Sequence, residues 1–217
     1  NRLVSVLSKE DIFSELRNTP VGSLLEYHNL GRAHEIDTQA QLLVGMCMDN
    51  RKHLHIPDNF SYIIRAGGAN LRYSEFKVSY AIAVGGVKHI ALIGHNQCGM
   101  VNLMARKEIF IQGLVETAGW DRDFAEQHFT QFAPMFEIGN EIDFVLSEAQ
   151  RFRLEELYVA FFNRTPDADG LEYWIGQFKG GMTINEIAES FYTAGVFFSD
   201  LTGYLPGVTN AAFVRVV

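Results

Sequence analysis

Two short segments of the sequence carry side chains that could bind a metal ion. An apolar run, Leu42–Met46, is followed directly by Cys47, and a second run over residues 90–94 is followed by His95 and Cys98. Both runs are brief and largely aliphatic, as expected of strands buried in a parallel sheet. Each run places polar residues at a strand's carboxyl end, which is the edge where ligands bind in open α/β sheets.

Two thiolates and one imidazole form the ligand set of a soft, tetrahedral zinc site with an open fourth position, as in catalytic zinc sites. We therefore predict that Cys47, His95 and Cys98 bind zinc. Two other interpretations stay open, because the cysteines could form a disulfide or be ordinary buried thiols. They are the only two cysteines of the chain, and no secretory signal pattern in its first 30 residues points to an oxidising compartment.

The composition narrows the class of protein. The chain has 217 residues, of which 47% are hydrophobic and 20% charged, as is usual for globular proteins. This length is sufficient for one large or two small domains. The net charge of −8 argues against nucleic acid as a partner. No apolar run approaches the roughly 20 residues of a membrane span, so we expect no membrane association and a cytoplasmic location.

Local patterns predict the elements that position these residues. Hydrophobic spacing and turn signals indicate strands and helices in an alternating order, which is typical of an α/β fold with parallel strands. A helix opening at Cys98 would place this thiol near a helix N-terminus, where the dipole favours the thiolate. Strands are expected over residues 42–46, 60–64 and 89–94, and helices over residues 9–17, 73–84, 98–107 and 136–153, with a helical pair over residues 108–135.

The two segments together carry a specific motif. The sequence reads Cys-x-Asp-x-Arg at residues 47–51 and His-x-x-Cys-Gly at residues 95–99. In this pattern the chain resembles the β-class carbonic anhydrases, whose signature is the same pair of motifs in the same order. The resemblance covers roughly residues 20–150, and residues 65–70 are similar to a glycine-containing segment of that family.

The resemblance implies a parallel central sheet flanked by helices and the reversible hydration of carbon dioxide to bicarbonate and a proton. Cys47, His95 and Cys98 would bind zinc, which lowers the pKa of bound water to about 7. Asp49 would accept a hydrogen bond from that water, and Arg51 would keep Asp49 ionised through a charge-assisted pair. In part of the family the same Asp instead binds zinc and closes the site. The family also implies a homo-oligomer built from dimers, with the site at a subunit interface.

Several positions depart from the family's pattern. Thr38 stands nine residues before the first Cys, where the family often has Gln, Asn50 replaces the usual Ser, and Gln97 stands where similar members carry Asp. These changes leave the ligand set intact and bear on the substrate instead. Some relatives hydrolyse carbon disulfide or carbonyl sulfide, which stays open as an alternative activity of the same site.

The rest of the chain resembles a different family. From about residue 151, the sequence is similar to the repeat of a helical domain of unknown function found in bacterial surface-layer proteins and secreted calcium-repeat proteins, with its best match over residues 157–174. We therefore predict two domains, a zinc domain over residues 1–150 and an all-α domain over residues 151–217. Residues 210–217 resemble the opening of a further, truncated repeat.

Capping signals support helices in this second segment. Helices are expected over residues 168–178 and 184–192, and Thr183 with Glu186 forms a capping box for the latter. Asp167 and Asp169 could indicate calcium binding, but the segment lacks the glycine and terminal glutamate of an EF-hand. We therefore favour the interpretation that the two acidic residues stabilise the start of a helix through its dipole. The second segment also allows an alternative function, a surface or scaffold protein with a catalytically weak zinc domain.

Overall fold

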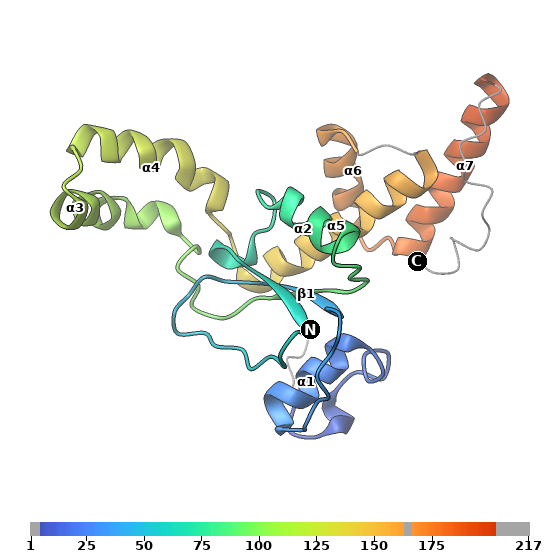
Figure 1. Cartoon of the computed structure of the whole chain (residues 1–217). Coiled ribbons are helices and arrows are strands. Elements are labelled where there is room, and N and C mark those ends of the chain that lie inside the picture. The colour runs from blue at the N-terminus through green and yellow to red at the C-terminus, as the bar shows by residue number, and fades with distance from the viewer. Residues whose placement is uncertain (1–4, 163–165, 203–217) are drawn as a thin grey trace. The chain divides into compact units, whose positions relative to one another are not determined.

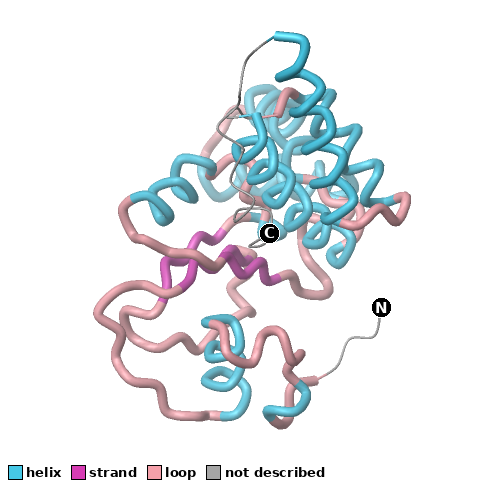
Figure 2. Tube along the Cα trace, turned by 90° about the vertical axis from the view of Figure 1, so that its right-hand side faces the viewer, coloured by secondary structure: helices cyan, strands magenta, loops and turns pink. Residues whose placement is uncertain are grey.

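The chain folds into two compact units. The computed structural model describes residues 5–162 and 166–202, so the residues resembling a truncated further repeat lie outside the described part. The first unit comprises Asn1–Val145 and the second Leu146–Val217. Helices predominate, and one small sheet lies in the first unit (Figures 1 and 2). None of the helices in the described ranges combines the length and apolar character that crossing a membrane requires.

The sheet has three parallel strands, as expected of an α/β fold. β1 (Leu42–Met46) lies in the centre, between β2 (Ser61–Arg65) and β3 (Ile90–Ile93). All five residues of β1 are buried, which explains why its sequence is an unbroken apolar run rather than an alternating one. The expected strands are confirmed, with ends that differ from the expected ones by at most one residue.

Different residues cover the two faces of β1. On one face, Leu24 of helix α1 (Pro20–Leu30) packs in a cluster with Leu42 and Val44. On the other face, Gly45 is flanked by two leucines, because a Cβ at this position would come within 2.8 Å of Leu71 and 2.9 Å of Leu92. The central strand is therefore enclosed on both faces immediately before Cys47.

The helix expected over residues 9–17 is wrong. Only a short 3-10 helix, η1 (Lys9–Asp11), forms there, and α1 begins at Pro20, three residues after the expected helix was to end. The Thr19 side chain accepts a backbone hydrogen bond from the first turn of α1, and Pro20 occupies a position at which the missing N–H is no loss. The Thr-Pro pair is thus a helix start.

Helix α2 (Glu75–Ala83) exposes its largest apolar side chains. It forms within the expected range of residues 73–84, and its buried face carries the small residues Val78 and Ala81. On the opposite side, Phe76 is 80% exposed, Tyr80 48% and Val84 66%. With Tyr73, which is half exposed and contacts Phe136, these residues form what we term the aromatic stripe, namely Tyr73, Phe76, Tyr80 and Val84.

The segment after Cys98 contradicts the expected helix over residues 98–107. Residues 98–102 form a loop, which includes a parallel β-bridge between Val101 and Ile138, and Asn102 has a positive φ of 54°. A 3-10 helix, η3 (Leu103–Arg106), follows. Because a left-handed residue cannot continue a right-handed helix, regular helix is delayed until after Asn102, and Cys98 does not lie at a helix N-terminus.

The helical pair expected over residues 108–135 is confirmed. α3 (Lys107–Ala118) and α4 (Arg122–Phe136) pack against each other, as Figure 1 shows. The helix expected from residue 136 begins later, as α5 (Glu141–Phe162). Asn140 explains this start, since its side-chain oxygen accepts hydrogen bonds from the backbone N–H groups of Ile142 and Asp143.

The second unit is all helical. The later part of α5 packs with α6 (Ala168–Lys179) and α7 (Ile184–Thr202) around a core that includes Leu157, Tyr158, Ile187 and Phe191. Both expected helices of this segment are confirmed, and α7 extends ten residues beyond residue 192.

The capping box of the second unit is confirmed. The N–H of Thr183 donates to Glu186 at 2.7 Å, and the N–H of Glu186 donates to the Thr183 hydroxyl at 3.3 Å. The side chain of Asp167 accepts the N–H of Gly170 at 2.8 Å, which is the role of an N-cap. These helix starts therefore follow from local sequence alone.

We expect substitution of a buried leucine of β1 to destabilise the first unit. Leu42 is completely buried, so Leu42→Ala should lower the free energy of unfolding by about 2–5 kcal/mol through lost apolar contact and a residual cavity. Leu7 is 82% exposed, and Leu7→Ala should change it by less than about 0.5 kcal/mol. Denaturant unfolding followed by far-UV circular dichroism measures both, and equal effects of the two substitutions would contradict the central place of β1.

Candidate metal centre

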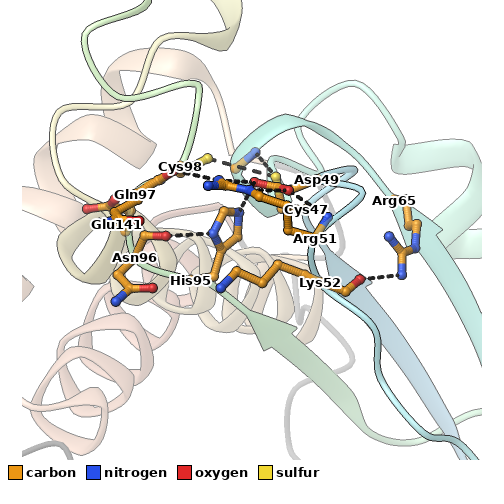
Figure 3. A network of polar contacts seen from close by, with 11 residues as sticks. Cys47, Asp49, Arg51, Lys52, Arg65, His95, Asn96, Gln97, Cys98 and Glu141 are labelled. Atoms are coloured by element: carbon orange, nitrogen blue, oxygen red, sulfur yellow. Dashed lines mark hydrogen bonds and ion pairs between the residues drawn. The ribbon is translucent and has the colours of Figure 1, made fainter.

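Cys47, His95 and Cys98 converge at one edge of the sheet. Cys47 directly follows β1, and the other two follow β3, its neighbour in the sheet. Their ligand atoms lie within 4.8 Å of one another (Figure 3). The convergence expected from the strand ends is therefore confirmed, and the three residues form a possible metal-binding group.

The two sulfur atoms are spaced as ligands of one metal ion would be. The Sγ atoms of Cys47 and Cys98 lie 3.8 Å apart, and both cysteines are free and buried. In a tetrahedral zinc site with Zn–S bonds of about 2.3 Å, two sulfur ligands are separated by about 3.8 Å. The spacing thus fits a shared metal ion, and the disulfide interpretation is not realised.

The imidazole of His95 is held with one nitrogen prepared for ligation. Its Nδ1 lies 2.9 Å from the backbone oxygen of Asn96. Since a carbonyl oxygen only accepts, Nδ1 carries a proton, and in the neutral imidazole Nε2 is then the nitrogen whose lone pair could bind a metal ion. Nε2 is buried without a hydrogen-bond partner, and its distance to Oδ2 of Asp49 is 3.9 Å. A buried polar atom without a hydrogen-bond partner is costly, and a metal ion would satisfy this one.

The glycine-containing loop after β2 completes the surroundings of Cys47. In the 3-10 helix η2 (Gly67–Ala69), Gly68 has a φ of 65°, and its N–H donates to Sγ of Cys47 at 3.3 Å. A Cβ at Gly67 would collide with the side chain of Met100. The sequence indicated this loop through its glycine pair, which permits both a positive φ and a close approach of the backbone.

The protonation of the three candidate ligands reflects their mutual contact. Burial raises the pKa of the Cys47 thiol, but His95 and backbone N–H groups outweigh it, so the pKa lies below its ordinary value. Burial and the neighbouring Cys47 raise the pKa of Cys98. Burial opposes the charged form of His95, yet Cys47 outweighs this effect and raises its pKa. A bound divalent cation favours the deprotonated form of all three residues, because each ligates without its proton.

Asp49 and Arg51 form a two-point ion pair beside this group. Nε of Arg51 donates to Oδ1 of Asp49 at 2.9 Å and to Oδ2 at 3.1 Å, and the N–H of Arg51 donates to Oδ1 at 2.9 Å. These hydrogen bonds hold the pKa of Asp49 far below its ordinary value. Nη2 of Arg51 also donates to the backbone oxygen of Gln97 at 3.0 Å. Arg51 therefore connects the two motif loops.

One contact at the site was not expected from the sequence. Oε1 of Glu141, the first residue of α5, accepts the N–H of Cys98 at 3.0 Å. This hydrogen bond lowers the pKa of Glu141. In the sequence, Glu141 has only the pattern of an acidic residue at a helix start, and no local signal relates it to a cysteine in a distant loop.

Comparison with known protein families finds a match in part of the chain. Residues 150–197 match a family described as a domain of unknown function, DUF4214. This match lies in the segment where the sequence resembles a helical domain of unknown function, and outside the residues of the candidate metal centre. No curated protein and no solved structure matches the chain.

We expect one metal ion per chain, held through His95. His95→Ala should abolish stoichiometric zinc binding, because it removes one of three ligands. His53 lies on an exposed part of the loop after Arg51, and His53→Ala serves as the matched control that should retain the metal. Elemental analysis after dialysis measures the content of each protein. Equal zinc content in the two variants would contradict the assignment.

Proposed function

We propose that the first unit is a zinc enzyme that reversibly hydrates carbon dioxide to bicarbonate and a proton. The observation that carries this proposal is the grouping of Cys47, His95 and Cys98 beside a carboxylate that Arg51 holds in place. When bound, zinc would supply a Lewis acid that ionises water near neutral pH and so provides the nucleophile for carbon dioxide.

The protein's own residues give the site an open position. Three ligands leave a tetrahedral ion one position short. Asp49 could fill that position, but its two oxygens accept hydrogen bonds from Arg51 instead. The ion pair therefore supports the state in which water has access to the site, rather than the closed state known in part of the β-class carbonic anhydrases.

Asp49 is suited to orient the attacking water. An ionised carboxylate only accepts hydrogen bonds, and Arg51 keeps Asp49 ionised by lowering its pKa. Oδ2 of Asp49 lies 3.9 Å from Nε2 of His95, so its carboxylate lies beside the ligand group. In this role Asp49 would accept a hydrogen bond from the attacking water and so orient its oxygen lone pair toward carbon dioxide.

We expect Asp49→Asn to reduce turnover without loss of zinc. An amide no longer acts only as an acceptor and no longer pairs with Arg51, so kcat should fall by about 10²–10⁴-fold. Stopped-flow hydration of carbon dioxide with zinc-loaded protein measures the rate, and elemental analysis checks the metal. Asp58→Asn, an exposed residue of a distant turn, is the control expected to keep full activity.

The same sample distinguishes the alternative substrates. Zinc-loaded wild-type protein that fails to hydrate carbon dioxide would contradict the proposed activity. Release of hydrogen sulfide from carbonyl sulfide or carbon disulfide by that protein would instead assign the site to the sulfur analogues.

We also propose that the first unit associates with a second copy of the chain through the aromatic stripe. Tyr62 extends this surface, since its ring lies against Gly85 just beyond the end of α2. From their exposed fractions, the exposed parts of Tyr62 and the three aromatic residues of the stripe amount to about 400 Å², at about 200 Å² for a whole aromatic side chain. This is about half of the roughly 800 Å² that each partner contributes to a standard interface, which supports a self-association site.

Sedimentation velocity tests this association. Wild-type protein should sediment as a dimer or larger oligomer, and Phe76→Ser with Tyr80→Ser should shift it to monomer, because two apolar contacts become polar. The exposed pair Ile109→Ser and Phe124→Ser on α3 and α4 is the control that should leave the dimer intact. A monomeric wild-type protein at tens of micromolar would contradict the proposal.

A further inference from the structure

Opposite charges hold the two ends of one peptide group in the second motif. The oxygen of the peptide between Gln97 and Cys98 accepts a hydrogen bond from Nη2 of Arg51 at 3.0 Å. The N–H of the same peptide donates to Oε1 of Glu141 at 3.0 Å. Figure 3 shows Gln97 and Cys98 close to Glu141, with Arg51 on the side of Asp49. The peptide dipole is thus aligned between a guanidinium and a carboxylate.

The backbone at this peptide needs such support. Gln97 has a φ of 57°, in the left-handed region that is unfavourable for a residue with a Cβ. A residue persists in this region when its surroundings over-determine it. The N–H that Glu141 accepts belongs to Cys98 itself, so this hydrogen bond fixes the backbone from which the sulfur-bearing side chain projects. Without it, Gln97 would be free to relax toward a more favourable φ and to move the Cys98 backbone with it.

We propose that Glu141 is a positioning residue of the metal centre, whose carboxylate fixes the Gln97–Cys98 peptide from the side opposite Arg51 and so directs Sγ of Cys98 toward Cys47 and His95. The inference rests on the proposed metal centre. It adds a residue that lies in neither motif and that is contributed by a helix beginning more than forty residues after Cys98.

Glu141 also has an ordinary role from which this one must be separated. It lies in the first turn of α5, where any acidic residue stabilises the helix dipole. Asp143 lies in the same turn and is exposed. Substitution of Asp143 therefore reproduces the loss of a first-turn charge, and it leaves the hydrogen bond to Cys98 in place.

The test compares metal binding in three variants of the full chain. Glu141→Ala should raise the zinc dissociation constant by about 10–100-fold, the usual effect of losing a residue that orients a ligand. It should also change the thiolate-to-cobalt absorption of the cobalt(II)-loaded protein. Glu141→Gln keeps an acceptor oxygen for the Cys98 N–H and should restore most of the affinity and the spectrum, and Asp143→Ala should match wild type. Competition with a chromophoric chelator gives the constants.

A second substitution tests the backbone argument. Glycine adopts a positive φ without steric penalty, so the effect of Glu141→Ala on zinc affinity should be smaller in a Gln97→Gly background than in wild type. An equal effect in both backgrounds would overturn the role of the left-handed backbone.

The outcomes separate this inference from the metal centre itself. Equal affinities and spectra for Glu141→Ala and Asp143→Ala would reduce Glu141 to a helix-start residue and overturn the inference alone. Equal losses in Glu141→Gln and Glu141→Ala would overturn the role of the hydrogen bond. A wild-type chain that binds neither zinc nor cobalt would overturn the metal centre and this inference together.

Discussion

The parallel pairing of β1 with β3 is the constraint on which the candidate metal centre depends. Met46 is in register with Ile93, so the residue after one strand and the loop after the other leave the sheet at the same edge. This shared edge brings Cys47 and His95 close to each other. Because successive residues of a strand point to opposite faces, a shift of the pairing by one residue would turn the side chains away from each other.

The balance of charge around the centre explains why its groups fit a cation. Two thiols and the carboxylates of Asp49 and Glu141 come from distant segments to this site, and Arg51 is the cation that the described contacts place among them. Buried anions without compensation are strongly unfavourable. A divalent ion compensates two thiolates, while Arg51 compensates Asp49. The metal ion would thus stabilise the charge of the two thiolates, and the ion pair with Arg51 stabilises the charge of Asp49.

The two units follow different physical rules. In the first, distant segments are brought together by sheet pairing, and positive φ values at Gly68 and Gln97 shape the loops around the cysteines. In the second, each helix begins at a local cap, and its core is made by helices that are near neighbours in sequence. The family match to a domain of unknown function falls on this second unit, so the chemistry proposed for the first unit depends on its own residues.

The sequence by itself determined the parts of this protein that local interactions decide. The strand Leu42–Met46 follows from an uninterrupted apolar run, and the Thr183 capping box from two side chains three residues apart. The candidate ligands could also be predicted from the sequence, because the carboxyl ends of parallel strands share one edge of a sheet. Local patterns predicted the wrong helix bounds near Pro20, because a proline can either end a helix or begin one.

Only the tertiary structure decided what depends on contacts between distant segments. The loop after Cys98 is not helical because Val101 pairs with Ile138 and Asn102 turns the chain, and neither effect has a local pattern. Glu141 reaches Cys98 only because α5 begins beside that loop. Local sequence records the propensity of a residue, whereas its partners are set by the packing of the whole unit, and the environment of the metal centre is made by such partners.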